Sequence, residues 1–344
     1  MFKPQYTITD LLLANIKKIN ALIAELNNNR FPNVILLELE RSAREVSAYA
    51  STSIEGNPLP LTEVKKILKF TPTHIRDSEK EVLNYNQALQ DLNKQLKEGT
   101  IKLSLNLILK IQKQVILDLL PKFETGHLRE KAVVVNDPRT GQPVYLPPDV
   151  KDVKPLMEDL IEFANNNTAN IDPLILAGIF HKQMIIIHPF IDGNGRTTRL
   201  VTKSLLAAMG LNTFNLFSFE NYYNQSVTKY FQTVGEFGNY YELVETIDFT
   251  VWLEYFTEGI IDELLRVQKL LPKTSISPAS ELQPYHIKII KFIQEKGFIS
   301  DRDYVKLVTR AKATRALDFQ KMIELDLIER KAKGRATYYI LKEK

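Results

Sequence analysis

The stretch "IDPLILAGIFHKQMIIIHPFIDGNGRTTRLVTKSLLAAMG", from Ile171 to Gly210, decides how the middle of this chain folds. Asp172 followed by Pro173 is typical of a helix start, and Pro189 disfavours a helix at the residue before it. After the short loop "DGNG", apolar residues recur at helical spacing until Gly210. The stretch therefore predicts a buried helix, a tight loop and a second helix.

The loop at the centre of this stretch has the composition of a phosphate-binding site. Gly193 and Gly195 allow the backbone to approach an anion, and the start of the following helix offers free N–H groups and a positive partial charge. Arg196 and Arg199 lie on one face of that helix, where two positive charges are unfavourable unless an anion arrives. Asp192 fits such a site if the anion carries Mg²⁺, which takes carboxylate oxygens together with phosphate oxygens.

His188 adds a proton acceptor to the loop, because an imidazole titrates near neutral pH. A base, a metal ligand, a phosphate cradle and arginines together indicate phosphoryl or nucleotidyl transfer. Each feature alone has a plainer explanation, namely a helix end, a turn or a solvated face. A metal hydrolase built on His181, His188 and Asp192 is an alternative, but the apolar neighbours of His181 favour a buried core histidine, and no HExxH spacing supports zinc.

The segment "HPFIDGNGRTTR" resembles, without a departure, the motif HPFxDGNGRxxR of Fic-domain (Fido) proteins, most of which are protein adenylyltransferases. The resemblance implies that His188 activates a Ser, Thr or Tyr hydroxyl of a target protein and that ATP supplies AMP. It implies Asp192 as the Mg²⁺ ligand and Phe190 as a core anchor. It also implies that the phosphates of ATP are held by Gly193, Asn194, Gly195, Arg196 and Arg199.

Two further segments extend the resemblance. The pieces "GHLREKAVVV" and "PVYLPP" flank a long turn and predict a β-hairpin over about residues 131–147, similar to the flap on which a target segment lies as an added strand. Pro143 in the second arm predicts that this arm is an edge strand. The segment "FSFENYYNQSVTKYFQTV" is similar to the region that closes over the nucleotide, with Tyr230 and Phe231 as the candidates near the adenine.

The stretch "SAYASTSIEGNPL", residues 47–59, ends an earlier predicted helix. Glu55 lies in its last turn, where the helix dipole favours a cation, and the plain explanation is a weak helix terminus closed by Gly56. The stretch also resembles the inhibitory motif (S/T)xxxE(G/N) of Fic proteins, with Ser51, Glu55 and Gly56 in register on a helix over about residues 41–56. The resemblance implies that Glu55 pairs with Arg199, blocks the γ-phosphate and inhibits AMP transfer, including transfer to the protein itself.

The C-terminal segment differs in charge and in pattern. From Pro284 to Lys344, 15 Lys or Arg stand against 8 Asp or Glu, whereas the rest of the chain is net negative. Three short helices followed by two strands joined at a basic turn predict a winged helix-turn-helix. Basic residues on its third helix and turn indicate binding of duplex DNA, and the candidates are Arg310, Lys312, Arg315, Lys333 and Arg335. The alternative is use of this module for protein contacts or for a homodimer.

The 344 residues as a whole predict a mainly α protein in four parts. These are an N-terminal helical region (1–100), a Fic-type helical bundle with a β-hairpin flap (101–271), a linker rich in Pro and Ser (272–284) and the winged helix-turn-helix (285–344). The lack of cysteine excludes disulfides and thiol nucleophiles. No apolar run reaches the roughly 18–20 residues of a membrane span, and the N-terminus lacks the apolar core of a signal peptide, so a cytoplasmic location is expected.

The leading prediction for function is a protein adenylyltransferase that uses ATP and Mg²⁺. One alternative keeps the fold and reverses the reaction, so that AMP is removed from a modified protein by a water molecule that Glu55 orients. Another is a DNA-binding regulator whose Fic core senses a nucleotide, for which His188 would be dispensable.

Overall fold

The computed structural model describes most of the chain, namely residues 2–29, 33–70, 72, 74–99, 101–136, 141–207, 209–271, 282–324, 327–332, 334 and 337–342. It divides into two compact units. The helical unit comprises Met1–Asn28 and Ser42–Leu270, and the C-terminal unit comprises Asn29–Arg41 and Leu271–Lys344. Most of the first 100 residues thus belong to the same unit as residues 101–270, whereas Asn29–Arg41 belong to the C-terminal unit. Most of the linker predicted at 272–284 lies outside the described residues.

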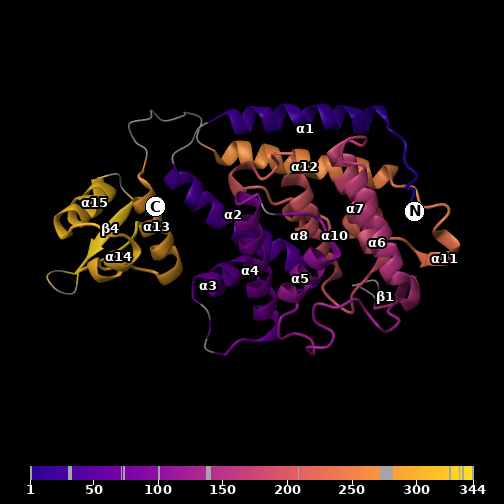
Figure 1. Ribbon diagram of the computed structural model, residues 1–344, viewed down its shortest axis with the longest axis horizontal. Coiled ribbons are helices and arrows are strands. Elements are labelled where there is room, and N and C mark those ends of the chain that lie inside the picture. The colour runs from indigo at the N-terminus through magenta and orange to yellow at the C-terminus, as the bar shows by residue number, and fades with distance from the viewer. Residues whose placement is uncertain are drawn as a thin grey trace. The chain divides into compact units, whose positions relative to one another are not determined.

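The helical unit is mainly α, as predicted (Figure 1). Its helices are α1 (Asp10–Asn28), α2 (Asn33–Ile54), α3 (Leu61–Lys69), α4 (Asp77–Lys97), α5 (Leu105–Val115), α6 (Val150–Asn166), α7 (Pro173–Ile187), α8 (Asn194–Ala207), the 3₁₀ turn η1 (Thr213–Asn215), α9 (Glu220–Gln225), α10 (Val227–Val234), α11 (Tyr240–Leu243) and α12 (Thr250–Leu270). Helix α2 contributes its first residues to the C-terminal unit and the rest to the helical unit. None of the described helices has the length and apolar character that crossing a membrane requires.

Helix α7 lies inside the helical unit because it is apolar on nearly all sides. It packs against α6, α8 and α12, and α1 lies alongside α12 (Figure 1). The contact with α12 is close at Gly178, whose carbonyl oxygen accepts a hydrogen bond from Nε1 of Trp252 at 2.8 Å. A Cβ on Gly178 would lie 2.6 Å from Cδ2 of Leu253, so only glycine allows α12 to approach this far.

Both ends of α7 lie where the sequence predicts them. Asp172 caps its start, with a side chain that accepts a hydrogen bond from the backbone N–H two residues on (2.9 Å), and Pro173 is the first helical residue. His188 is the C-cap, in the left-handed conformation with φ 49° and ψ 59°. Helix α8 begins at Asn194, so both arginines of the motif lie in its first turns.

A small sheet consists of β1 (Val135–Asn136), β2 (Pro143–Leu146) and β3 (Gly238–Asn239), in the order β1-β2-β3. β1 and β2 are antiparallel, which confirms the predicted hairpin, and residues 137–140 lie outside the described part. The predicted edge position of β2 is wrong, because β3 pairs with it in parallel at Tyr145 and Leu146. Pro143 is compatible with a central strand since it is the first residue, before that pairing begins.

The C-terminal unit contains α13 (Pro284–Lys296), α14 (Asp301–Leu307), α15 (Lys312–Glu324), β4 (Ile328–Lys331) and β5 (Tyr338–Leu341). β4 and β5 are antiparallel, and Ile299 forms a bridge to Tyr339. The buried cluster at its centre includes Ile289, Tyr304 and Phe319. Three helices followed by a hairpin is the predicted order of elements, whereas the assignment as a winged helix-turn-helix stays a prediction.

Candidate active site

His188 lies half-buried at the end of α7, beside the loop that leads to α8. Its Nδ1 lies 3.3 Å from the carbonyl oxygen of Ile185, so Nδ1–H donates there and Nε2 of the neutral ring carries no proton. Burial lowers the pKa of His188 to about 4, against the opposing effects of the Ile185 carbonyl and the Glu55 carboxylate. The imidazole is therefore neutral at physiological pH, and Nε2 can accept a proton.

The loop between α7 and α8 is held by its own residues and by α5. Asn194 closes it, because Oδ1 accepts from the backbone N–H of Phe190 and Nδ2 donates to the carbonyl oxygen of Phe190, both at 2.9 Å. Phe190 itself is fully buried. Gln112 of α5 donates to the carbonyl oxygen of Asp192 (3.2 Å) and accepts from the N–H of Gly126 (2.6 Å). These hydrogen bonds hold the loop in one conformation.

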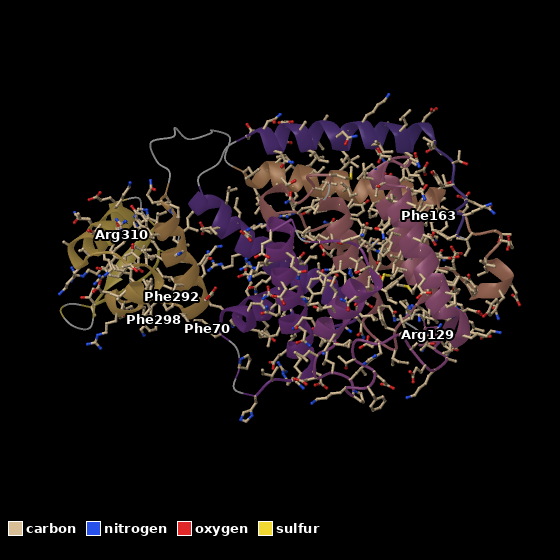
Figure 2. The ribbon with its side chains drawn as sticks, viewed as in Figure 1. Phe70, Arg129, Phe163, Phe292, Phe298 and Arg310 are labelled. Atoms are coloured by element: carbon tan, nitrogen blue, oxygen red, sulfur yellow. The ribbon has the colours of Figure 1, made fainter. Side chains whose placement is uncertain are left out.

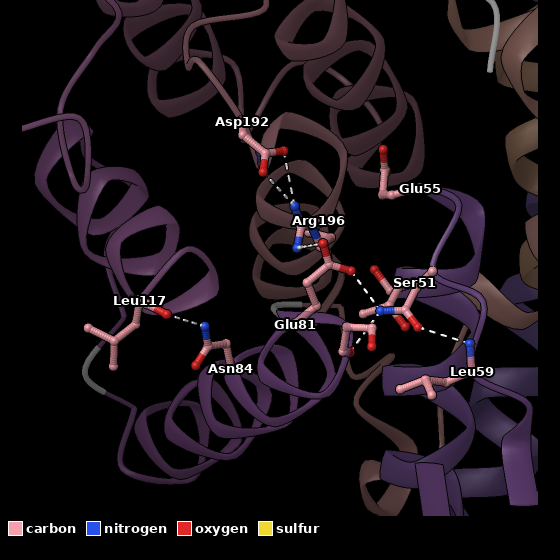
Figure 3. A network of polar contacts seen from close by, with 12 residues as sticks. Ser51, Glu55, Leu59, Glu81, Asn84, Leu117, Asp192 and Arg196 are labelled. Carbon is pink, nitrogen blue, oxygen red and sulfur yellow. Dashed lines mark hydrogen bonds and ion pairs between the residues drawn. The ribbon is translucent and has the colours of Figure 1, made fainter. Parts of the chain in front are cut away.

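Arg196 is buried behind the loop and has unused hydrogen-bond donors. Its Nη2 contacts both carboxylate oxygens of Asp192, at 3.0 and 3.1 Å, and its Nη1 lies 3.6 Å from Oε1 of Glu81 (Figure 3). Neither Nε nor Nη1 has a hydrogen-bond partner within the described part of the chain. A buried guanidinium with unused donors favours an anionic ligand, because leaving such donors unpaired costs free energy.

Asp192 is the motif residue that fits Mg²⁺. Its side chain is 49% exposed, so a ligand arriving from solvent can reach the carboxylate that now pairs with Arg196. Across the described ranges, no group of three or more His, Cys, Asp or Glu side chains is placed to hold a metal. A lone carboxylate beside an anion loop suits Mg²⁺, which is commonly bound through one or two carboxylates together with substrate phosphates.

Arg199 is fully buried and is bound by the end of α2. Its Nε donates to Oγ of Ser51 (2.8 Å), and its Nη2 donates to the carbonyl oxygen of Ser51 (2.8 Å) and to Oε1 of Glu55 (2.7 Å). Gly56, with φ 91°, ends the helical conformation just beyond. The Glu55 carboxylate also reaches into the anion loop, because a Cβ on Gly195 would lie 2.1 Å from Oε1 of Glu55. The expected contact between Glu55 and Arg199 is present.

A series of buried hydrogen bonds next to Arg199 orients Tyr230. The Tyr230 hydroxyl lies 3.5 Å from Nη1 of Arg199 and 3.1 Å from Nε2 of His181. Thr202 donates to the carbonyl oxygen of Thr198, so it accepts from Nδ1–H of His181 (3.0 Å), and Nε2 of His181 accepts from Tyr230. Burial lowers the pKa of His181 well below its ordinary value. His181 is therefore a neutral core histidine that fixes Tyr230, which disfavours the alternative metal site.

The motif faces a cavity of about 350 Å³, within the range of roughly 300–1,000 Å³ typical of ligand sites. His188, Gly195 and Glu55 line one part of it. The hairpin, α10 and the residues after α10 line the rest, including Val135, Val144, Tyr145, Tyr230, Phe231 and Phe237. The structure thus brings the motif, the end of α2 and both aromatic candidates to one cavity.

Sequence reasoning missed Arg129, which connects the hairpin to the backbone of His188 (Figure 2). Its Nε donates to the carbonyl oxygen of His188 and its backbone N–H to that of Pro189, both at 2.9 Å. Its Nη1 and Nη2 donate to the carbonyl oxygens of Lys131 and Pro148, on either side of the hairpin. Burial lowers the pKa of Arg129. The only signal for this role in the sequence was an arginine just before the predicted hairpin.

Two of the candidate DNA-binding residues have partners inside the C-terminal unit. Arg315 is 8% exposed and binds both carboxylate oxygens of Asp301, at 2.7 and 2.8 Å. Arg310, labelled in Figure 2, binds Asp318 (2.8 Å) and lies over the ring of Tyr285. These guanidinium groups stabilise the unit and are poorly placed to bind a phosphate, which argues against them as DNA contacts.

The other basic candidates leave the question of DNA binding open to experiment. Lys312 is exposed at the start of α15. Lys333 and Arg335 lie outside the described residues, although Gly334 between them is described. DNA binding by this unit stays a prediction that rests mainly on the charge of the sequence.

The helix–loop–helix and its anion loop define the class of the protein. Residues 102–206 match the sequence profile of the Fic/DOC family. The protein adenylyltransferase fic-1 of Caenorhabditis elegans is 31% identical over 179 residues, which are 50% of this chain and 34% of that protein. The protein adenylyltransferase Fic of Drosophila grimshawi is 29% identical over 182 residues, 52% of this chain and 36% of that protein. The match spans about a third of the length of these relatives.

Solved structures show the same fold. A Fic family protein from Desulfovibrio desulfuricans G20 superposes with a TM-score of 0.64 at 21% identity, covering 100% of this chain and 99% of that one. Residues 134–508 of Fic-1 from Caenorhabditis elegans superpose with a TM-score of 0.60 at 22% identity, covering 75% and 72% of the two chains. At these identities, the likeness establishes the fold and leaves the reaction to be argued from the site.

Proposed function

We propose that this chain is a protein adenylyltransferase that transfers AMP from ATP to a hydroxyl group of a target protein, and that Glu55 inhibits it. The observation that supports this most directly is the single cavity lined by His188, Gly195 and Glu55. A base, an anion loop and an internal carboxylate share this cavity, so the carboxylate competes with a phosphate for the same donors. The relatives named protein adenylyltransferase support the same reaction.

In the proposed reaction, Nε2 of His188 accepts the proton of the target hydroxyl while the hydroxyl oxygen attacks the α-phosphorus of ATP. A bond forms between that oxygen and phosphorus, the bond from phosphorus to the bridging oxygen breaks, and pyrophosphate leaves. Backbone N–H groups at the start of α8 and the unused donors of Arg196 stabilise the phosphate charge. Asp192 would hold Mg²⁺, which neutralises part of that charge.

The proposed inhibition follows from the partners of Arg199. Its Nε and Nη2 are taken by Ser51 and Glu55, and its Nη1 lies next to Tyr230. While Glu55 is bound, only Nη1 of this guanidinium has a donor left for a γ-phosphate, and the Glu55 carboxylate beside it repels the phosphate. Breaking a hydrogen bond between charged groups costs roughly 1.5–3 kcal/mol, which corresponds to about a tenfold to hundredfold effect on binding.

A target segment is proposed to dock on the hairpin as an added strand. Because β3 covers one side of β2, the strand of the hairpin that keeps an open edge is β1, and β3 forms the other edge of the sheet. Arg129 joins this hairpin to the backbone of His188, so a strand added at β1 would be positioned relative to the base.

The test is mass spectrometry of the Glu55→Gly protein incubated with ATP and Mg²⁺. We expect an AMP adduct on the protein itself, weaker in wild type and absent from Glu55→Gly/His188→Ala. Glu98→Gly is a matched control, because Glu98 also precedes a glycine at a helix end but does not line the cavity. Equal labelling of wild type and Glu55→Gly would contradict inhibition, and no adduct on the protein or on added protein substrates would contradict transfer.

Glu55 also supports a second candidate activity, the hydrolytic removal of AMP from a modified protein. Its side chain is 29% exposed and lines the cavity beside His188, so it can orient a water molecule toward the α-phosphorus. In that case wild type would remove the adduct from the purified, modified Glu55→Gly protein, and fresh Glu55→Gly would not. An adduct that persists with both proteins would exclude this activity.

A further inference from the structure

The cavity beside His188 has two ends of different character. Gly195 and Glu55 mark the phosphate end, at the start of α8. The other end is lined mainly by apolar side chains from the hairpin, from α10 and from the residues that follow α10, namely Val135, Val144, Phe231, Val234 and Phe237. A nucleotide with its phosphates at the loop would place its base in this second end, because bases have flat, largely apolar faces.

Besides the two buried tyrosines, Tyr145 and Tyr230, the second end has one polar side chain that is held in place. Asn136, Thr228 and Gln232 are exposed. Glu236 is only 22% exposed, and its Oε1 lies 2.7 Å from Nζ of Lys182. A carboxylate held in this way loses little conformational freedom when a ligand binds, so its hydrogen bond contributes more to selectivity than a mobile group would.

Lys182 fixes the whole segment that carries Glu236. The lysine side chain is 4% exposed, and Nζ also donates to the carbonyl oxygens of Thr233 (3.0 Å) and Gly235 (3.4 Å). Lys182 lies on α7 six residues before His188, a rise of about 9 Å along the helix axis. Glu236 therefore lines the cavity from a segment that is fixed to the middle of α7, whereas His188 lines it from the end of the same helix.

We propose that Glu236, held by Lys182, accepts a hydrogen bond from the 6-amino group of adenine and thereby selects ATP. This inference rests on the proposed function, because it assumes that the phosphates lie at the loop of α8. It concerns a separate question, the identity of the base, on which the motif itself says nothing.

The ion pair with Lys182 explains why adenine is preferred to guanine. A free carboxylate can bind guanine through two neighbouring donors, N1–H and the 2-amino group, but this uses both of its oxygens. Lys182 holds Oε1 of Glu236, which fixes the direction of the carboxylate and leaves Oε2 as the oxygen best placed to accept from a ligand. Adenine offers a single amino group at position 6, whereas guanine and hypoxanthine present a carbonyl oxygen there, which a carboxylate repels.

The experiment compares binding of ATP and ITP, whose bases carry an amino group and a carbonyl oxygen, respectively, at position 6, and of which only hypoxanthine carries a proton on N1. Isothermal titration calorimetry with Mg²⁺ on Glu55→Gly/His188→Ala measures affinity without turnover and without the internal carboxylate. We expect ATP to bind roughly tenfold to a hundredfold more tightly than ITP, the effect of one hydrogen bond to a charged group. When Glu236→Gln is added to this protein, the preference for ATP over ITP should fall to about threefold or less, because the introduced side-chain amide can also donate a hydrogen bond to the 6-carbonyl oxygen of ITP.

Two further proteins keep the result interpretable. Glu242→Gln makes the same chemical change at an exposed position outside the cavity and should leave the ratio unchanged. Lys182→Met/Glu236→Gln removes both charges together, so it avoids a buried unpaired lysine if Glu236→Gln alone unfolds the protein. Thermal unfolding of each variant checks the fold.

The outcomes separate the inference from the proposed function. The inference is overturned if ATP and ITP bind equally before Glu236 is changed. It is also overturned if the preference for ATP over ITP is the same after both Glu236 substitutions, because another group would then select the base. If neither nucleotide binds to any variant, the proposed function fails together with it. A preference for ATP over ITP that is lost in the Glu236 variants and kept in Glu242→Gln supports the inference.

Discussion

The carboxylate of Glu55 lies 2.7 Å from Nη2 of Arg199, although 144 residues separate the two in the sequence. Ser51, one turn earlier on α2, binds the same guanidinium through its hydroxyl and its carbonyl oxygen. Two successive turns of α2 thus hold one buried arginine. Because Ser51 remains when Glu55 is removed, loss of Glu55 is expected to change activity more than stability.

Gly195 provides a test of whether Glu55 occupies the anion loop in solution. A Cβ at this position would lie 2.1 Å from Oε1 of Glu55. Gly195→Ala should therefore lower the free energy of unfolding by about 1–3 kcal/mol in wild type but by less than about 1 kcal/mol in Glu55→Gly. Urea unfolding of the four proteins measures this coupling. If Gly195→Ala lowers the free energy of unfolding equally in wild type and in Glu55→Gly, the Glu55 carboxylate does not lie next to Gly195 in solution.

Arg129 is expected to position His188 without touching the nucleotide. Lysine cannot replace all of the carbonyl contacts made by the guanidinium, so Arg129→Lys should loosen the backbone of His188. In the Glu55→Gly background, kcat for AMP transfer should fall about tenfold to a hundredfold, with little change in KM for ATP. Partial recovery of an Arg129→Ala protein by added guanidinium ion would support positioning. A rise in KM with unchanged kcat would contradict it.

The titration of His188 can be followed directly. Burial lowers its pKa to about 4, so the folded protein should keep a neutral imidazole from pH 8 to about 5. As the pH falls, the unfolded chain protonates His188 near pH 6.5, before the folded protein does. The contribution of the neutral, buried ring to the free energy of unfolding is therefore present above about pH 6.5 and is lost as the pH falls toward 4. The NMR shift of its Cε1–H, assigned with His188→Ala, measures the midpoint. A midpoint near 6.5 would mean that the ring is solvated.

Arg310 in the C-terminal unit is expected to stabilise the fold. It pairs with Asp318, whose side chain is 6% exposed, and lies over Tyr285. Arg310→Ala should lower the free energy of unfolding of this unit more than Lys312→Ala does, because the buried Asp318 carboxylate loses its cation. Lys312→Ala, at an exposed neighbouring position, should change it by less than about 0.5 kcal/mol. Thermal unfolding compares the two variants. If both have equally small effects on stability, Arg310 does not stabilise the unit and again becomes a candidate for contacts with DNA.

Local signals in the sequence predicted the elements of the site well. The cap at Asp172, the proline after His188 and the glycines of the loop each act within a few residues, and the helix ends lie where these signals predict. The order of three helices and a hairpin in the C-terminal unit follows from the same kind of signal. The contact of Glu55 with Arg199 was expected only because a second motif resembled the family's inhibitory segment.

Other features depend on contacts between distant segments, for which a single sequence has no local signal. Arg129 lies 59 residues before His188, and only the fold brings its guanidinium to that backbone. β3 pairs with β2 across about ninety residues, which is why the edge position predicted from Pro143 was wrong.

The sequence by itself determined the helix–loop–helix, its charges and the residue types of a phosphate site, because capping, helical periodicity and glycine conformation act over short distances. Only the tertiary structure decided which donors are already taken: Arg129 by the backbone of His188, Arg315 by Asp301, and Lys182 by Glu236. The physical reason is that a buried charge binds whatever opposite charge the packing brings to it, and packing joins segments far apart in the chain.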